Sequence, residues 1–183
     1  MKIHATDFPG LYTVVPEFLE DERGFFAVVA NGQLPKGGRY FIQMNIAFNK
    51  LRGTLRGMHM QDDPNAQAKL VRCVRGSIND VVVDIRPQSP KFCEAYSAFL
   101  TEDNRESLYV PPGFLHGYVT LEDNTEVQYQ VTAPYAPESA VGFRWNDLKF
   151  RMSGSSYPGI TWMVDPVVVS ERDQSYPDFN LKP

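Results

Sequence analysis

Five polar side chains that can bind ligands or transfer protons lie along two apolar, strand-like segments between residues 55 and 74. They are Arg56, His59, Gln61, Lys69 and Arg72. Burying an unpartnered histidine or lysine costs several kcal/mol, so positions that turn such groups into a core are typical of binding or reactive sites. The alternative is that His59 is a hydrogen-bonded core histidine and Lys69 a surface charge.

The chemistry that suits this set is proton transfer next to a carbonyl group. His59 can accept a proton near neutral pH, and the ammonium group of Lys69 can stabilise an enolate oxygen. Tyr129 shares an expected inward face with Val127 and Val131 and could return a proton. A base on one side and an acid on the other would invert a carbon centre. A strand tyrosine such as Tyr129 is, however, more often a core aromatic whose hydroxyl is satisfied by a neighbour.

The strand that carries His59 leaves one orientation open. Regular alternation over residues 54–61 puts Gly57, His59 and Gln61 on one face and Arg56 on the other. Either Gly57 marks a bulge that turns Arg56 towards His59, or Arg56 lines a different part of the site. The next strand, residues 69–75, places Lys69 on the same face as Val71 and Cys73.

Short alternating runs separated by turn residues predict an all-β fold of about ten strands. The expected strands are residues 11–15, 25–30, 40–48, 54–61, 69–75, 78–86, 95–100, 108–110, 117–121 and 127–132. We expect residues 20–24 to form the turn of an entry hairpin, residues 31–39 to be a loop, and the strand at 78–86 to be central because both its faces are patterned. Gln43 and Asn45 share a face of their strand. After Pro134 the chain is irregular, with Phe143, Trp145 and Trp162 as anchors and only short peripheral helical segments.

Length and composition fit one soluble domain over residues 1–183. A chain of 183 residues can bury more than about two thirds of its unfolded surface without staples. The net charge of −4 disfavours a nucleic-acid binder. Two cysteines, one of them in an apolar run, argue against a disulfide framework. The sequence has no apolar run long enough to predict a signal peptide or a membrane span. We therefore expect a cytoplasmic protein.

Two spacings resemble the metal-binding motifs of the small jelly-roll barrels called cupins. Gly53 precedes His59 by the expected distance, and residues 111–116 match the Pro-x-Gly-x-x-His pattern that ends at His116. The cupin motif continues His-x-His and then a glutamate, whereas this chain reads His59-Met60-Gln61 and has no glutamate at residues 64–66. A catalytic transition metal needs about three protein ligands. We therefore expect neither a metal nor another cofactor.

A set of motifs along the chain resembles the dTDP-4-dehydrorhamnose 3,5-epimerase family. The match runs in order from about residue 5 to residue 178 without large gaps. Its segments are DERGFF (residues 21–26), LRGMH (55–59), AQAKLVR (66–72), DVVVDIR (80–86), PGFLHG (112–117), YAPES (135–139) and SERD (170–173).

This resemblance implies a metal-free, cupin-type homodimer, a double-stranded β-helix jelly roll that epimerises carbons beside the C4 ketone of a nucleotide-linked 6-deoxy sugar. By resemblance, His59 is the base, Asp173 the carboxylate paired with it, Tyr129 the proton donor, and Lys69 and Arg56 cationic groups around the ketone and sugar. The remaining implied contacts to substrate are His116, Gln61, Arg23, Phe26, Gln43, Asn45 and Tyr135, of which Arg23 and Phe26 would reach the neighbouring subunit's pocket.

Two departures from the family pattern bear on the substrate. Met60 stands where many members have an aromatic residue, and residues 27–29 read Ala-Val-Val where a glutamate often helps to bind the thymine nucleotide. The choice of nucleotide and of inverted carbon stays open at this point. The alternatives are a single-carbon epimerase or keto-sugar isomerase on the same scaffold, and a non-catalytic sugar-binding module.

Overall fold

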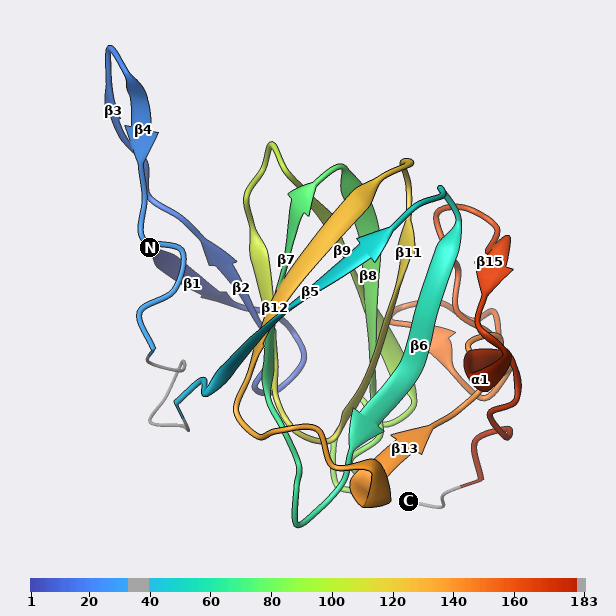
Figure 1. The fold of residues 1–183 in the computed structure, drawn as a ribbon. Helices are drawn as coiled ribbons and strands as arrows, with labels where there is room; N and C mark the ends of the chain where they lie inside the picture. Colours follow the sequence, from blue (N-terminus) through green and yellow to red (C-terminus); the bar gives the residue numbers. More distant parts are fainter. Residues whose placement is uncertain (33–39, 181–183) are drawn as a thin grey trace.

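Two facing β-sheets form the body of the molecule in a computed structural model that describes residues 1–32 and 40–180 (Figure 1). One sheet has six strands in the order β1 (Lys2–Ala5), β2 (Tyr12–Val15), β10 (Ser107–Val110), β7 (Lys69–Arg75), β12 (Thr125–Val131) and β5 (Gln43–Asn49). The other has seven: β13 (Ala140–Gly142), β6 (Thr54–Gln61), β11 (Phe114–Thr120), β8 (Ser77–Asp84), β9 (Glu94–Thr101) and β14 (Arg151–Met152), with β15 (Val168–Val169) paired to β6. The jelly-roll fold predicted from the sequence is confirmed.

The main core fills the space between the sheets. Val71 and Cys73 of β7 pack there against Ile78 and Val82 of β8, and all four are fully buried. Val71 and Cys73 lie on the inward face that their alternation predicts, and Cys73 is a free thiol. Between the same two sheets the core borders a cavity with polar lining residues such as Lys69 and His116.

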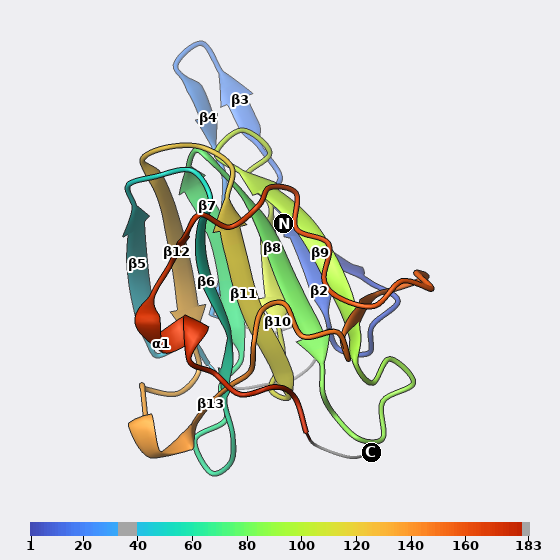
Figure 2. The same ribbon diagram turned by 90° about the vertical axis from the view of Figure 1, so that its right-hand side faces the viewer.

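A second core covers the outer face of the seven-stranded sheet. Val81 and Val83 of β8 pack there under the C-terminal part of the chain, which crosses this face in Figure 2. Phe143 is buried in this cluster, and Trp145 and Trp162 pack against it, as the sequence predicts. Strand β8 is therefore buried on both faces and central, which confirms the expectation from its double pattern.

The N-terminal region differs from the sequence prediction. The expected strand at residues 25–30 ends at Phe26, and its partner is not β2: β3 (Leu19–Asp21) pairs with β4 (Gly24–Phe26) in a small separate hairpin, while β2 pairs with β1 and β10. The local apolar pattern could not show this, because partner choice depends on neighbouring strands. The hairpin projects from the barrel (Figure 1). The expected loop at residues 31–39 lies mostly outside the described residues.

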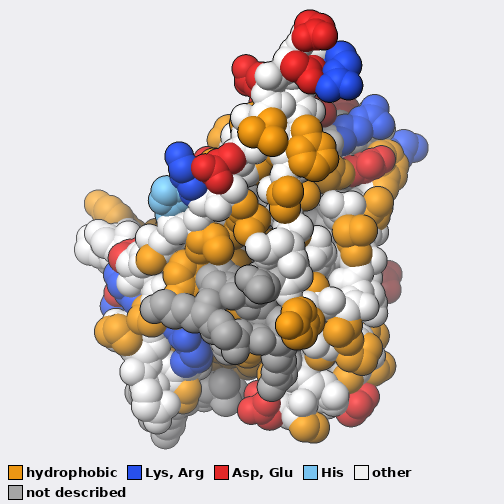
Figure 3. Space-filling view, turned by 90° about the vertical axis from the view of Figure 1, so that its left-hand side faces the viewer, with side chains coloured by type: hydrophobic (Ala, Val, Ile, Leu, Met, Phe, Trp, Pro, Cys, Tyr) orange, Lys and Arg blue, Asp and Glu red, His pale blue; other side chains and the backbone are white. Residues whose placement is uncertain are grey.

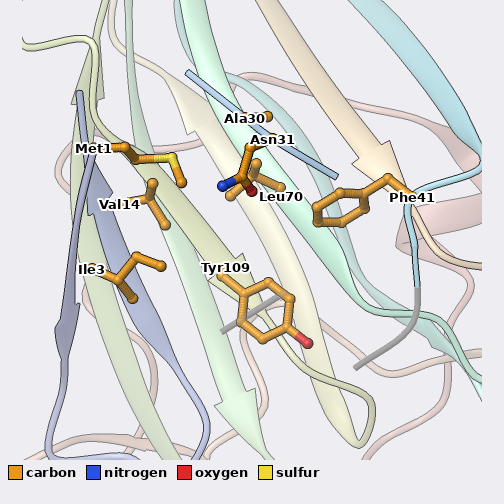
Figure 4. Close-up of a pocket in the computed structure, with 8 residues that line it drawn as sticks. All are labelled: Met1, Ile3, Val14, Ala30, Asn31, Phe41, Leu70 and Tyr109. Carbon is orange, nitrogen blue, oxygen red and sulfur yellow. The ribbon is translucent and has the colours of Figure 1, made fainter. Parts of the chain in front are cut away.

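A small apolar cluster attaches the N-terminus to the outer face of the six-stranded sheet. Val14, Leu70 and Tyr109 are buried there, and Ala30 and Phe41 pack against the cluster from the segments that follow the hairpin and precede β5. These side chains surround a cavity of only about 10 Å³ (Figure 4). Ala30 thus contacts the sheet from a segment, residues 27–32, that forms no strand.

Helical structure is minor. The described residues contain one α-helix, α1 (Glu171–Gln174), and one 3₁₀ turn, η1 (Pro137–Ser139). In this part of the chain no helix has the length and apolar character that crossing a membrane requires. The shortness of the helices agrees with the absence of helical periodicity in the sequence.

Candidate active site

A cavity of about 350 Å³ opens between the two sheets, and its reactive side chains come from both walls. His59 on β6 and His116 on β11 belong to the seven-stranded sheet, whereas Lys69 on β7 and Tyr129 on β12 belong to the six-stranded sheet. Asp173 reaches the same cavity from α1. The fold thus brings all four residues expected to be catalytic, and His116, into one cavity.

A β-bulge in β6 answers the question that the sequence left open about Arg56. His116 lies opposite His59 and Tyr118 lies opposite Arg56, so three steps along β6 match two steps along β11. The extra residue turns Arg56 onto the cavity side with His59. Gly57 sits in the bulge with a φ of +123°, and a Cβ there would lie 2.6 Å from the Cα of Gly117. Only glycine fits this position.

His59 is held in its neutral form by its surroundings. Burial lowers the pKa of its imidazole from 6.5 to about 3, and the positive charges of Lys69, His116 and Arg172 act in the same direction. A neutral imidazole has a free lone pair at neutral pH and can accept a proton. His59 therefore meets the first requirement of a general base.

Lys69 is 7% exposed, and burial lowers the pKa of its ammonium group to about 8. The carboxylate of Asp80 opposes this shift and helps to keep Lys69 charged. Asp80 is fully buried, and its Oδ1 lies 2.6 Å from Nε2 of His116. The sequence analysis assigned Asp80 no role, although its alternation with Val82 already places it on the inward face.

Asp173 is positioned by the short helix at the C-terminal end of the described chain. Ser170 caps α1 by accepting a hydrogen bond from the Asp173 backbone N–H at 3.1 Å. The Asp173 carboxylate is 7% exposed and accepts a hydrogen bond from the Gly57 N–H at 3.3 Å. Asp173 and His59 both line the cavity, but among the described residues no hydrogen bond joins them, and the Asp173 carboxylate instead holds the bulge at Gly57.

Gln61 and Tyr135 both line the cavity, but Gln61 is buried and Tyr135 is exposed. The Gln61 side chain donates to the carbonyl oxygens of Asn65 (2.8 Å) and Pro134 (3.1 Å) and accepts from the Ala136 N–H (2.8 Å). These bonds occupy its amide and fix the segment that carries Tyr135. The Tyr135 side chain is exposed and its hydroxyl accepts a hydrogen bond from Arg172 at 3.3 Å, so Tyr135 is available to a ligand and Gln61 supports it.

The other four residues expected to bind substrate do not line this cavity. On β5, Gln43 donates to Asn45 at 2.6 Å, and Asn45 lies opposite Tyr129 in register, next to the cavity. Arg23 pairs with Asp21 on the β3–β4 hairpin, and Phe26 of the same hairpin is 66% exposed. The hairpin projects from the body of the two sheets (Figure 1), and none of its described residues lines the cavity. Arg23 and Phe26 are therefore not brought to the cavity of their own chain.

Four further cavity-side residues escaped the sequence analysis. Tyr118, Ser170 and Arg172 line the cavity, and Asn49 hydrogen-bonds Arg56 and Tyr118 from behind it. Ser170 and Arg172 belong to the SERD segment of the resemblance, but the sequence analysis assigned them no role, and Asn49 and Tyr118 lie in none of the motifs. Their positions in the site depend on the bulge and on the path of the C-terminal segment. Within the described residues, no three histidine, cysteine or acidic side chains lie together as a metal site requires.

Comparison with known proteins adds to this geometry. The family model for dTDP-4-dehydrorhamnose 3,5-epimerase matches residues 5–180. The chain belongs to this epimerase family. The resemblance predicted from the motifs is therefore confirmed, and with it the assignment to a class of isomerase enzymes.

Individual relatives agree with the family assignment. A dTDP-4-dehydrorhamnose 3,5-epimerase of Sinorhizobium fredii is 43% identical over 137 residues, which cover 74% of this chain and 66% of that protein. The crystal structure of the Elizabethkingia anophelis member has a TM-score of 0.87 at 33% identity and covers 98% of this chain and 96% of its own. A Legionella pneumophila 3,5-epimerase, solved with dTDP-4-keto-L-rhamnose, has a TM-score of 0.83 at 29% identity, with 97% and 92% covered.

Proposed function

We propose that this protein epimerises C3 and C5 of a dTDP-linked 4-keto-6-deoxy sugar, converting dTDP-4-dehydro-6-deoxy-D-glucose to dTDP-4-dehydro-L-rhamnose. The observation that carries the proposal is the placement of His59 and Tyr129 on opposite walls of one cavity, with Lys69 beside them. The ligand of the Legionella relative supports the substrate class.

In the proposed reaction, neutral His59 removes the proton from the carbon next to the C4 ketone. The C–H electron pair forms a carbon–carbon double bond, and the carbonyl pair moves to O4, which becomes an enolate oxygen. The ammonium group of Lys69 stabilises that negative charge. The enolate then collapses and takes a proton from the Tyr129 hydroxyl on the opposite face, which leaves the carbon inverted. Solvent returns the proton of His59 to Tyr129, and the carboxylate of Asp173 stabilises the transient imidazolium.

The rest of the substrate extends from the cavity towards β5. Arg56 offers a guanidinium group to the diphosphate, since arginine is suited to such bidentate anions. Gln43, Asn45 and Tyr135 lie along the path from the cavity mouth and supply hydrogen bonds to the nucleoside. The hairpin of a second subunit would bring Arg23 and Phe26 to the same nucleotide.

A single experiment tests the reaction and separates the alternatives. The protein is incubated in deuterium oxide with a panel of 4-keto-6-deoxy nucleotide sugars, and the ring protons are followed by NMR. We expect deuterium to enter both positions beside the ketone and both centres to invert. Exchange and inversion at one carbon would indicate a single-carbon epimerase, and no exchange with any sugar would leave a binding module as the better description.

The pH dependence of turnover is expected to follow the protonation state of the Lys69 ammonium group. Because its pKa is lowered to about 8, the charged form is complete at lower pH and is lost as the pH rises through that value. We expect kcat to fall above about pH 8 and to show no acid limb from His59 between about pH 5 and 7, since the pKa of His59 is about 3. In the control variant Lys69→Arg, a permanently charged guanidinium should remove the alkaline limb even where kcat is lower. An unchanged limb in that variant would assign it to another group.

We also propose a homodimer in which the outer face of β5 is covered. Met44, Ile46 and Phe48 are 59%, 65% and 49% exposed on this face, and β5 is an edge strand of its sheet. An exposed apolar edge strand needs a cover. Hydrophobic side chains also gather at the base of the projecting hairpin (Figure 3). Pairing through these surfaces would bury the apolar stripe and carry Arg23 and Phe26 to the partner's cavity.

Light scattering at micromolar concentration tests the dimer. We expect the parent to have twice the 20.8 kDa mass of the chain. Ile46→Glu should shift it to the monomer, because two buried carboxylates would face an apolar interface. Leu148→Glu is the matched control, since Leu148 is 70% exposed on the C-terminal segment away from β5. A monomeric parent would contradict the proposal.

A further inference from the structure

The amide of Asn49 uses its full hydrogen-bonding capacity in a buried position behind the cavity. Asn49 ends β5 and is 1% exposed. The two N–H groups of its Nδ2 are shared among three acceptors, the carbonyl oxygens of Ala47 and Thr125, both at 3.2 Å, and the Tyr118 hydroxyl at 3.3 Å. The Tyr118 hydroxyl also lies 3.4 Å from Oδ1, to which it can donate instead. Its Oδ1 accepts from Nε of Arg56 at 2.8 Å. Carbonyl oxygens only accept and a guanidinium only donates, so these partners determine which way the amide points.

Within the described part of the chain, the Arg56 guanidinium is hydrogen-bonded to the protein through two of its nitrogen atoms and not through the third. Nε donates to Asn49, and Nη2 donates to the Phe48 carbonyl oxygen at 3.2 Å. Both acceptors come from the end of β5. Among the residues that the structure describes, none accepts a hydrogen bond from Nη1, although Arg56 lines the cavity. The guanidinium therefore keeps donors for a ligand while β5 fixes its orientation.

Because the Asn49 amide is neutral, it leaves the positive charge of the Arg56 guanidinium available to a ligand. A carboxylate at this distance would pair with the guanidinium and compete with an anionic ligand. Asparagine makes the same orienting hydrogen bond without neutralising the positive charge. Tyr118 contacts the same amide and is 4% exposed, so its ring closes the network against the core.

We infer that Asn49 is a positioning residue, which sets the Arg56 guanidinium for the diphosphate of the substrate. This inference rests on the proposed function, because it assumes that Arg56 binds the diphosphate. An arginine side chain loses rotamer freedom when it binds, and restraint in advance lowers that cost. Loss of Asn49 should consequently weaken nucleotide binding more than it slows the chemical step.

The test measures dTDP binding by calorimetry, together with KM and kcat for the keto sugar. We expect Asn49→Ala to weaken dTDP binding and raise KM about tenfold, as for the loss of one hydrogen bond to a charged group, with kcat changed less than about threefold. Arg56→Ala should weaken binding at least as much. In the double variant, Asn49→Ala should add nothing to Arg56→Ala, because the residue it positions is gone.

Asn79→Ala is the matched control. Asn79 is another fully buried asparagine, and its side chain bonds Ser97 at 2.6 Å and the Met163 N–H at 3.1 Å, away from the cavity. It should lower the unfolding temperature and leave dTDP affinity unchanged. Asn49→Ser, which keeps a polar group, repeats the measurement if alanine prevents folding.

The outcomes separate this inference from the proposed reaction. Unchanged dTDP affinity in the Asn49 variants of an active protein would overturn the positioning role, as would effects of Asn49→Ala and Arg56→Ala that add. If the parent binds dTDP but converts no keto sugar, the reaction fails, and a weakened Asn49 variant would still support the positioning role.

Discussion

Replacement of His59 by alanine is expected to lower kcat by about three orders of magnitude, because a positioned general base contributes roughly 10²–10⁴-fold and the cavity holds no equivalent. The other cavity histidine, His116, is engaged with Asp80 at 2.6 Å, and Lys69 is a cation in most molecules at neutral pH. Neither can replace a neutral imidazole. The measurement is turnover of the keto sugar by NMR, with folding checked by thermal unfolding.

Two comparisons sharpen this result. His4→Ala, at an exposed position on β1, should leave kcat unchanged. Asp173→Ala should be milder than His59→Ala, because in the proposed mechanism its carboxylate stabilises the imidazolium without exchanging the substrate proton. Asp173 also accepts from the Gly57 N–H, so its loss should disturb the bulge and raise KM as well. Parent-like turnover by His59→Ala would end the proposed mechanism.

Replacement of Tyr129 by phenylalanine is expected to separate exchange from inversion. His59 can still remove the proton, so the enolate forms, but the proposed proton donor to its opposite face is missing, while Lys69, on the same wall as Tyr129, stays at the enolate oxygen. The variant in deuterium oxide should take up deuterium next to the ketone with retained configuration, while the inverted product falls by about two orders of magnitude or more. The hydroxyl has no hydrogen-bond partner among the described residues, so stability should change by less than about 1 kcal/mol.

Tyr157→Phe provides the control for this variant. Tyr157 is 79% exposed and is not among the residues that line the cavity, so exchange and inversion should both match the parent. If Tyr129→Phe inverts the centre as fast as the parent, Tyr129 is not the acid. Tyr135 in the lining, or a water molecule in the cavity, would then be the donor to examine.

Alternation in the sequence was sufficient to locate the strands that carry the reactive groups. The predicted limits of β6 and β7, residues 54–61 and 69–75, coincide with those of the structure. The inward faces of Lys69 and Tyr129 were also predicted correctly. Side chains alternate strictly along a strand that has one buried face, so local sequence carries this information. The motif resemblance supplied the family, which the comparisons confirm.

The tertiary structure decided how distant residues meet. The side of β6 on which Arg56 lies depends on a bulge that is defined only by the pairing with β11. The contact between Asp173 and Gly57 joins residues 116 positions apart, and the bond between His116 and Asp80 spans two neighbouring strands. Asn49 hydrogen-bonds Arg56 only because β5 ends beside the cavity. Periodicity in the sequence shows which way a side chain faces within one strand. Hydrogen-bond partners on other strands depend on the order and register of the strands, and long-range packing sets both.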